Sequence, residues 1–511
     1  MGEDQEETIA FLARPTSYGP GIAEVERIDS HGSVVFLAGA HAYKLKRAVR
    51  FSYLDYSSLE LRRRACEREV ILNRRTAPKL YLGVAAVTRG AAGLALGGDG
   101  QAVDWLVEMA RFDEAGLFDR MASKGRLSER LMRDLADRIA EFHAAAEIDC
   151  TAGGASAIAR VIAGNDHNLR ASSADFPPAT LDRLHTVSSK ALERIAPLLD
   201  RRREKGHVRL CHGDLHLRNI CLFDGRPTLF DCVEFSDEIA RIDVLYDLVF
   251  LLMDLRHRRL NQLANQVFNR YLDRRDEADG LAAIPLFLSL RAAIRAHTGA
   301  AAAARQSDPR QAAALRSDIA FYLDEALAFL APSAPVLVAV GGLSGTGKST
   351  LAYALAPELG CAPGARVLRS DVLRKRLMGV TPETRLDDAG YTPETTHRVY
   401  TALLVEAAAA IASGQAAVVD AVFLSEDERD AVAAVARAAG VPFRGLWLDA
   451  PPAVLESRIE ARRGDASDAI LAVLRLQERQ TAGRIDWLRL DASPGRPDHV
   501  LQQAWRALAI Q

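Results

Sequence analysis

The sequence lacks the features that would place the chain in a membrane, on a nucleic acid or among secreted disulfide-linked proteins. Among its 511 residues no apolar run approaches the roughly 18 that a membrane-spanning helix needs, and the first residues lack a signal peptide's basic and apolar regions. The six cysteines form no CxxC pair, which predicts reduced thiols in a cytoplasmic protein. With 65 Lys and Arg against 67 Asp and Glu, no long-range field draws the chain to nucleic acid or to an anionic bilayer.

Lysine is also scarce, because only eight of the 65 basic residues are lysine and the rest are arginine. Where this sequence merely needs a surface cation, it uses arginine. A compact ammonium and a planar guanidinium are not interchangeable at a phosphate group. A lysine inside a motif is therefore more informative here than in most sequences.

The chain contains two halves with different patterns. Residues 30–110 are typical of a small strand-rich lobe, residues beyond about 111 are largely helical, and Ala331-Pro-Ser-Ala-Pro335 ends that pattern. Afterwards strands alternate with helices, which predicts a parallel sheet. We expect a domain over 1–331, with a small lobe over about 25–110 and a helical lobe over about 111–331, and a second domain over 335–511. The predicted elements include strands at Ser33–Ala38, Ala42–Lys46, Val103–Met109, Val336–Val340, Ala416–Asp420 and Phe443–Leu448, and helices over about Glu60–Arg75 and Ser128–Glu147.

A glycine-rich loop opens the second half. It reads Gly342-Leu-Ser344-Gly345-Thr346-Gly347-Lys348-Ser349-Thr350 and matches G-x-x-x-x-G-K-[S/T] between an apolar strand and a helix, the context that this motif requires. Glycines allow backbone N–H groups to surround phosphate oxygens, and the helix N-terminus adds positive potential. We expect Lys348 to reach the terminal phosphates and the Ser349 hydroxyl to ligate Mg²⁺.

Other polar residues of this half extend the predicted site. Asp420 ends a strand and is expected on the Mg²⁺ side, with a helix N-cap as the alternative. Asp371 could accept a proton from an acceptor hydroxyl while Arg374 grips the acceptor, or both could belong to a solvated helix face. Arg458 and Arg462 precede a glycine and could close over the transferring group as a lid, or form a charged outer face.

At these residues the second half resembles small P-loop kinases, a group that includes gluconate kinase-like, polynucleotide kinase-like and zeta toxin-like proteins. The resemblance covers about 335–490. It implies an α/β P-loop NTPase fold with a parallel sheet, and binding of ATP or GTP with Mg²⁺. The acceptor is not readable from the motif.

The first half carries a second motif. Arg209-Leu-Cys-His212-Gly213-Asp214-Leu-His216-Leu-Arg-Asn219 is followed by Leu229-Phe230-Asp231. Phosphoryl transfer requires mainly positioning and neutralisation of charge. Asp214 is suited to orient an acceptor hydroxyl and take its proton, while Asn219 and Asp231 offer the oxygen ligands that Mg²⁺ prefers.

This motif resembles the aminoglycoside phosphotransferase family, relatives of protein kinases, over roughly residues 25–300. The resemblance implies an α+β bilobal protein kinase-like fold, with Asp214 as catalytic base and Asn219 and Asp231 as metal ligands. Two departures are visible: no G-x-G-x-x-G loop precedes the expected phosphate lysine, and Asp231 is followed by Cys-Val-Glu-Phe rather than by the family's usual continuation.

The same resemblance places the phosphate lysine on the strand Ala42–Lys46. Alternation points Lys44 and Lys46 to the same face, and we prefer Lys44 because Ala-Tyr-Lys reads like the kinase Ala-apolar-Lys. Its expected ion-pair partner is Glu69, with Glu67 as the alternative. Met109 is expected at the hinge that contacts adenine.

Together the motifs predict a bifunctional ATP- and Mg²⁺-dependent phosphotransferase that acts on hydroxyls of small molecules. One alternative is a regulatory protein in which the P-loop half senses nucleotide and controls the other half. Another is a P-loop half that phosphorylates nucleic-acid ends, although the balanced charge argues against a nucleic-acid partner.

Overall fold

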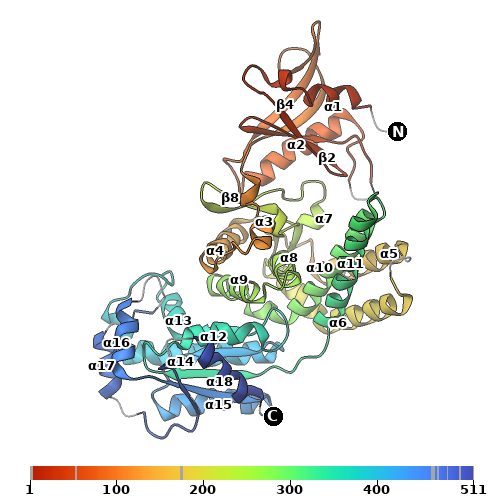
Figure 1. Cartoon of the computed structure of the whole chain (residues 1–511). Helices are drawn as coiled ribbons and strands as arrows, with labels where there is room; N and C mark the ends of the chain where they lie inside the picture. Colours follow the sequence, from red (N-terminus) through yellow and green to blue (C-terminus); the bar gives the residue numbers. More distant parts are fainter. Residues whose placement is uncertain are drawn as a thin grey trace. The chain divides into compact units, whose positions relative to one another are not determined.

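Alternating apolar residues near the start of the chain form a six-stranded antiparallel sheet in the order β1-β2-β3-β6-β4-β5. Figure 1 labels two of its strands, β2 and β4. The chain is described by a computed structural model over residues 4–51, 54–172, 176–461, 467–468, 471–479, 482–493 and 497–509. The third strand begins one residue earlier than the predicted Ala42, since His41 already pairs with Ala38 and Ala110. The six strands are β1 (Val25–Asp29), β2 (Ser33–Ala38), β3 (His41–Lys46), β4 (Tyr81–Gly90), β5 (Gly93–Leu96) and β6 (Gln101–Ala110).

Helix α2 (Leu59–Asn73) packs against this sheet. It begins at the N-cap Ser58, whose side chain accepts a hydrogen bond from the Leu61 N–H. Its buried stripe repeats at helical spacing but contains charged residues, among them Arg62 and Glu69. Arg62 pairs with the equally buried Asp104 at 2.8 Å, which satisfies one of these charges.

The chain divides into two compact units, Met1–Ala157 with Asp200–Asp254 and Ile158–Leu199 with Leu255–Gln511. The first unit therefore holds the antiparallel sheet together with the segment that carries Asp214. Its other elements are α1 (Glu6–Leu12), η1 (Pro15–Tyr18), η2 (Glu114–Gly116), α3 (Phe118–Ser123), α4 (Glu129–Ala145), β7 (Val208–Leu210), η4 (Leu217–Asn219), β8 (Ile220–Phe223), β9 (Arg226–Leu229), α7 (Asp237–Ala240) and β10 (Arg241–Asp243). Helices α5 (Gly154–Ala171), α6 (Pro178–Glu204) and α8 (Val244–His257) have residues in both units.

The second unit contains a five-stranded parallel sheet in the order β12-β13-β11-β14-β15. β11 is buried along its whole length, as expected for a parallel strand that is covered on both faces. One face packs on α12 and α18, whose Leu351, Leu355 and Ala504 join the strand residues in one core cluster. The strands are β11 (Leu337–Gly342), β12 (Arg366–Arg369), β13 (Ala417–Asp420), β14 (Phe443–Asp449) and β15 (Leu488–Asp491).

Helices complete the unit, some of them before the first strand of the sheet along the chain and the others between or after its strands. The helices are α9 (Asn261–Arg274), η5 (Ala278–Ala283), α10 (Ile284–Ala303), α11 (Pro309–Phe329), α12 (Lys348–Leu355), η6 (Ala356–Glu358), α13 (Ser370–Leu377), η7 (Asp388–Tyr391), α14 (Pro393–Ala412), α15 (Glu426–Ala439), α16 (Pro452–Ala461), α17 (Leu471–Arg479) and α18 (Pro497–Ala509).

Helix α9 covers the exposed edge of this sheet, strand β12. The buried Asn269 accepts from the Val367 N–H at 2.7 Å and donates to the Ala365 carbonyl at 3.1 Å. Asn265 donates to the same carbonyl at 3.0 Å. The amide of Asn269 thus pairs with the edge strand as a neighbouring strand would, which satisfies backbone groups that an open edge leaves unpaired.

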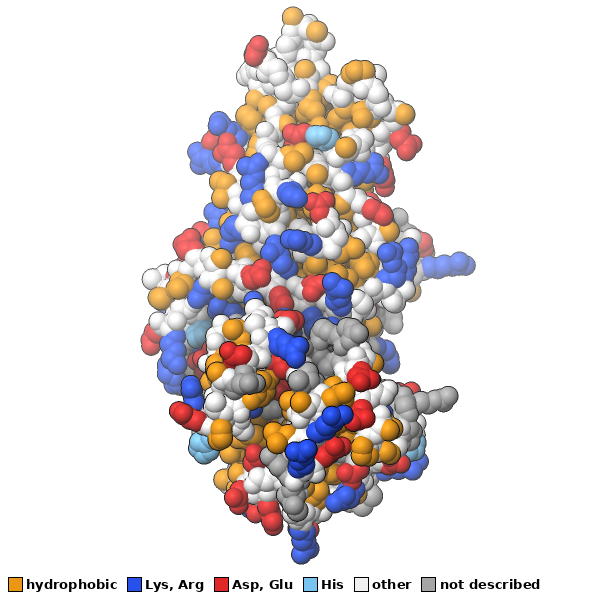
Figure 2. Space-filling view, turned by 90° about the vertical axis from the view of Figure 1, so that its left-hand side faces the viewer, with side chains coloured by type: hydrophobic (Ala, Val, Ile, Leu, Met, Phe, Trp, Pro, Cys, Tyr) orange, Lys and Arg blue, Asp and Glu red, His pale blue; other side chains and the backbone are white. Residues whose placement is uncertain are grey.

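No helix among the described residues is both long and apolar enough to cross a membrane. On the face shown in Figure 2, acidic and basic side chains are interspersed among the described residues and form no broad patch of one sign, which agrees with the net charge of −2.

A partly buried histidine in the second unit predicts a pH dependence of stability. His257 lies 2.7 Å from Asp318 and 2.8 Å from Glu325 and stacks on Tyr322. Burial lowers the pKa of His257, but the hydrogen bonds to the two carboxylates outweigh it and raise the pKa to about 8. Since the folded pKa lies above the unfolded value, the stabilisation is complete below about pH 6.5 and is lost as the pH rises through 8.

We expect the free energy of unfolding to fall by about 1 to 2 kcal/mol between pH 6 and pH 9 for this reason, after allowance for solvent screening at the half-exposed Asp318. Urea unfolding at a series of pH values would measure it. In His257→Gln this part of the slope should be absent, and an unchanged slope in the variant would contradict the assignment.

Candidate functional sites

The segment between β7 and β8 presents Asp214 on a loop. Asn219 Nδ2 donates to Asp214 Oδ2 and to the Asp214 carbonyl, both at 2.9 Å, and His216 Nε2 lies 3.3 Å from Oδ2. The Asp214 side chain is 41% exposed, so an incoming hydroxyl could reach it. The predicted base and the predicted amide ligand therefore lie side by side.

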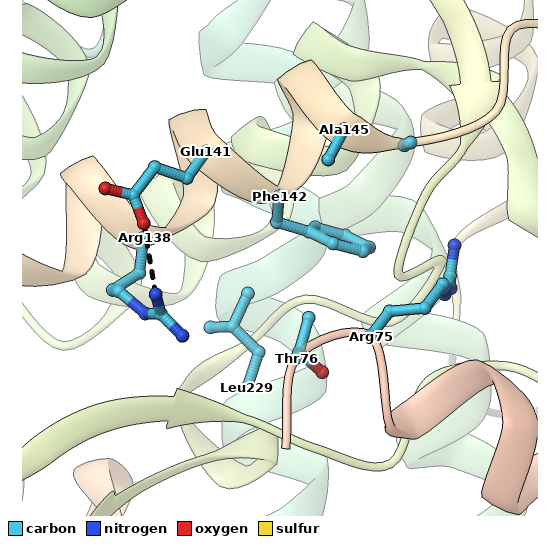
Figure 3. A pocket seen from close by; sticks show the side chains of 8 residues that line it. Arg75, Thr76, Arg138, Glu141, Phe142, Ala145 and Leu229 are labelled. Atoms are coloured by element: carbon cyan, nitrogen blue, oxygen red, sulfur yellow. Dashed lines mark hydrogen bonds and ion pairs between the residues drawn. The ribbon is translucent and has the colours of Figure 1, made fainter. Parts of the chain in front are cut away.

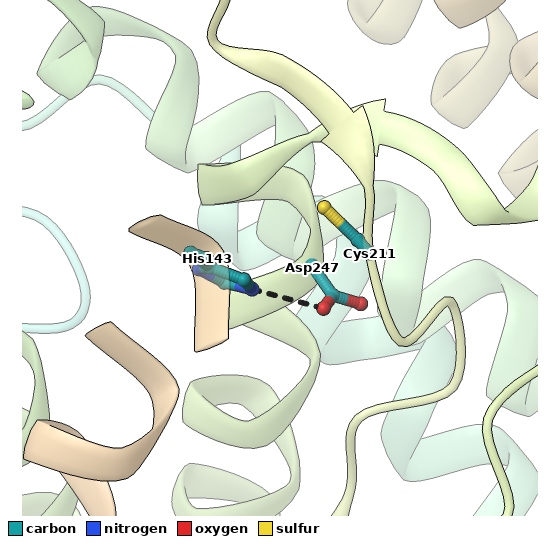
Figure 4. A group of neighbouring side chains, drawn as sticks. All are labelled: His143, Cys211 and Asp247. Atoms are coloured by element: carbon teal, nitrogen blue, oxygen red, sulfur yellow. Dashed lines mark hydrogen bonds and ion pairs between the residues drawn. The ribbon is translucent and has the colours of Figure 1, made fainter. Parts of the chain in front are cut away.

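A buried carboxylate, Asp247 of α8, anchors this segment (Figure 4). It accepts hydrogen bonds from the His212 N–H at 3.0 Å and the Gly213 N–H at 2.9 Å, and His143 Nε2 lies 3.1 Å from it. His143, Cys211 and Asp247 have the spacing of a metal site. However, both oxygens of Asp247 already face these donors, so we interpret the cluster as an anchor for the loop.

The β8–β9 hairpin brings the second predicted carboxylate toward this loop. The Phe230 N–H donates to the Asn219 carbonyl at 3.0 Å, so Asp231 follows directly after a residue paired with Asn219. Asp231 has a left-handed backbone (φ 62°), and its N–H donates to the Tyr81 hydroxyl at 3.1 Å. Carboxylate and amide oxygens gathered in this way fit Mg²⁺, which takes oxygen ligands.

The two lysines of β3 share Glu69 but differ in their second carboxylate partner. Lys44 Nζ donates to Glu69 Oε1 at 2.8 Å and to Asp231 Oδ1 at 2.6 Å. Lys46, which is almost fully buried, also forms an ion pair with Glu69, and its second partner is Glu234. Burial raises the pKa of Glu69, but Lys44 and Lys46 together bring it down to about 2.

The remaining predictions for this half can be placed as well. Glu67, the alternative partner, pairs with Arg63 on the surface. Met109 lies near the end of β6, in register with Ala42 and Tyr81. Its contact with a nucleotide stays a prediction.

The glycine loop joins β11 to α12. Gly345 and Gly347 have φ of 89° and 92°, a conformation that favours glycine, and Lys348 Nζ donates to the Leu343 carbonyl at 3.0 Å. The Ser349 hydroxyl donates to Asp420 Oδ2 at 2.5 Å. Because β11 and β13 pair with Val340 opposite Asp420, the parallel register places this carboxylate beside the loop. Asp420 is not a helix cap, since α15 begins after Ser425.

Asp371 and Arg374 of α13 face different surroundings. Burial raises the pKa of Asp371, against the opposing influence of Arg369 and Lys348. The buried Arg374 donates to the Gly390 carbonyl at 2.8 Å and lies over the Tyr391 ring, so it is engaged by the segment that follows α13.

Helices α16 and α17 approach the glycine loop. Arg458 donates to the Ala492 carbonyl at 2.8 Å and to the Thr346 carbonyl at 3.4 Å. Gln477 of α17 accepts a hydrogen bond from the Ser344 N–H at 3.0 Å, a contact that the sequence did not predict. Arg462, the other predicted lid residue, lies outside the described residues.

A separate cavity of about 380 Å³ lies beside α4, lined by Arg75, Phe142 and Leu229 among others (Figure 3). Arg75 lies over the Phe142 ring and donates to the Leu210 carbonyl at 2.6 Å. Arg75 therefore braces the strand that leads into the Asp214 segment.

The fold combines a kinase-like phosphotransferase domain with a P-loop domain. Residues 60–283 match the model of the phosphotransferase enzyme family, and residues 337–483 match that of an AAA domain. The predicted resemblances and the two-domain fold class are thereby confirmed. The chain is an ATP-dependent phosphotransferase whose acceptor is unknown.

The chain belongs to the same family as an uncharacterized protein of Mycobacterium tuberculosis (strain ATCC 25618 / H37Rv), which is 31% identical over 504 residues that cover 93% of this chain and 95% of the relative. An uncharacterized protein of Mycobacterium bovis matches to the same extent.

Solved structures resemble each half. A choline/ethanolamine kinase family protein from Mesorhizobium loti is 15% identical, with 63% of this chain and 98% of that chain covered and a TM-score of 0.38. A sugar kinase from Janibacter sp. is 23% identical, with 34% and 95% covered and a TM-score of 0.27.

Proposed function

We propose that the protein is a bifunctional phosphotransferase in which each half uses a Mg²⁺-bound nucleoside triphosphate to phosphorylate the hydroxyl of a small molecule. The observation that carries the proposal is the convergence of Lys44, Glu69 and Asp231 in the half that also pairs Asp214 with Asn219. These are the groups that phosphoryl transfer requires, gathered from segments nearly 190 residues apart.

At the first site, Asn219 and Asp231 would hold the metal, which supplies charge neutralisation at the phosphates. Lys44 would exchange its contact with Asp231 for a phosphate oxygen while Glu69 keeps it in place. Asp214 would orient the acceptor hydroxyl and take its proton as the oxygen–phosphorus bond forms and the bond to the leaving diphosphate breaks.

At the second site, the glycine loop would surround the phosphates, with Lys348 on their terminal oxygens and Ser349 and Asp420 on the metal side. Asp371, whose pKa is raised by burial, would take the acceptor's proton. ATP is the expected donor at both sites.

One observation favours a regulatory function for the P-loop half as a second candidate. Helix α9 lies within the residues that match the phosphotransferase family, yet its Asn269 is bonded to β12 of the P-loop half. A shift of β12 on nucleotide binding would therefore move α9 through this hydrogen bond.

The test is an acceptor screen with the full-length chain. Purified protein is incubated with Mg²⁺-ATP and a panel of hydroxylated compounds, including sugars, gluconate, choline and aminoglycosides, while ADP release and acceptor mass are followed. Wild type is compared with Asp214→Asn, Lys348→Ala and the double variant.

We expect each single variant to lose a different phosphorylated product and the double variant to lose both. If Lys348→Ala abolishes only the Asp214-dependent product, the regulatory alternative is favoured. Product formation by the double variant at the wild-type rate would exclude both sites.

A further inference from the structure

Two lysines of the small lobe share one glutamate. Lys44 and Lys46 lie two residues apart on β3 and point to the same face, where the fully buried Glu69 contacts Lys44 with Oε1 and Lys46 with Oε2. Lys44 is 14% exposed and also touches Asp231, whereas Lys46 is only 2% exposed. The two lysines are therefore in different positions relative to an incoming nucleotide.

Glu234 completes the environment of Lys46. It follows Asp231 by three residues, pairs with Lys46, and accepts a hydrogen bond from the Tyr56 hydroxyl at 2.7 Å. The Tyr56 ring centroid lies 5.1 Å from Lys46 Nζ, within range of a cation–π contact. Through its ion pair with Lys46, Glu234 thus links the segment that follows Asp231 to strand β3.

Glu69 needs a counter-ion at all times because an unpaired charge in a buried position is strongly unfavourable. When Lys44 turns toward a phosphate group, its hold on Glu69 weakens. Lys46, which is paired on its other side with Glu234, keeps Glu69 neutralised and in place. Lys44 can then change partners without displacing the glutamate that orients it.

We propose that Lys46 and Glu234 are positioning residues for phosphoryl transfer, which hold Glu69 fixed while Lys44 moves from Asp231 to the nucleotide. The proposal rests on the proposed function of the first site. It assigns a task to the Glu that follows Asp231 at the point where this sequence departs from the family's usual continuation.

The test uses the full-length chain in three variants, Lys46→Met, Glu234→Gln and the double variant Lys46→Met/Glu234→Met. Thermal unfolding of the nucleotide-free protein, calorimetric binding of Mg²⁺ with a non-hydrolysable ATP analogue, and kcat are measured for each. Both single variants should unfold at a lower temperature, since Lys46→Met leaves the buried Glu234 without a cation and Glu234→Gln leaves Lys46 with only one of its two carboxylates. The double variant removes both charges and should recover most of that loss.

The double variant separates positioning from stability. Its nucleotide affinity and kcat should each stay roughly tenfold below wild type although its unfolding temperature recovers, because Glu69 then depends on Lys44 alone. Lys79→Met is the matched control, since Lys79 pairs with Asp224 on the surface, and all its values should equal those of wild type.

Recovery of both affinity and kcat in the double variant would overturn the proposal, and so would wild-type values in Lys46→Met. A wild type that binds the analogue but phosphorylates no acceptor would count against the proposed function instead. The binding measurement would still decide whether Lys46 and Glu234 position Lys44.

Discussion

Asp214→Asn should lower kcat for the product of the first site by about 10³-fold and change nucleotide affinity by less than about twofold. The amide at position 214 can still accept the hydrogen bond from Asn219 Nδ2, so the loop geometry is kept. It cannot take a proton from the acceptor hydroxyl. The loss is therefore expected in the chemical step. Steady-state kinetics would measure kcat, and calorimetric binding of Mg²⁺ with an ATP analogue would measure nucleotide affinity separately.

The matched control for this variant is Asp224→Asn, which removes a carboxylate of similar chemistry. Asp224 is exposed and pairs with Lys79 at the turn between β8 and β9. Its kcat should stay within the error of the wild-type value. An Asp214→Asn protein that keeps more than about a tenth of wild-type kcat would show that another group takes the proton or that none is required.

The sequence was sufficient to predict which side chains lie close together where these are neighbours along the chain. The order of Asp214, Asn219 and Asp231 predicted a shared site because the two later residues flank a short hairpin, Asn219 directly before β8 and Asp231 two residues after β9. The same holds for the loop from Gly342 to Ser349. In both cases the local backbone alone brings the groups together, so the motif contains the geometry.

Some contacts between distant segments were not predicted, although the pair of Lys44 with Glu69 was. Lys44 and Lys46 point to the same face of β3, and their surroundings differ through distant residues, with Asp231 beside Lys44 and Glu234, 188 residues along the chain, beside Lys46. Gln477 reaches the Ser344 N–H from 133 residues away. Neither contact produces a periodic signal in the sequence, because each is made by a single side chain and not by a repeated face of a helix or strand.

The contact that covers the edge of the parallel sheet was not predicted either. The Pro-rich segment predicted a domain boundary near residues 332–335. Nothing in the sequence of α9 predicted that Asn269, before this boundary, would form hydrogen bonds with a strand almost 100 residues later. Edge strands need cover, but the sequence of β12 does not say which element supplies it.

Asn269→Ala should consequently destabilise the unit that contains the P-loop by about 3 kcal/mol. The change leaves the Val367 N–H without its 2.7 Å acceptor and removes one donor from the Ala365 carbonyl, in a place that water does not reach. Each buried polar group that loses its partner costs about 1 to 3 kcal/mol. Arg366 pairs with Asp273 at 2.7 Å and also donates to the Asn269 side chain, and it would lose this second hydrogen bond as well.

Urea unfolding followed by the fluorescence of Trp447 and Trp487, which lie on and beside β14 of this sheet, would measure the loss. Asn261→Ala, at the exposed start of α9, is the control and should change stability by less than about 0.5 kcal/mol. Equal stability of the two variants would mean that β12 does not depend on α9. A destabilised Asn269→Ala that also loses the Asp214-dependent product at a temperature where it is still folded would instead support control of the phosphotransferase half through α9.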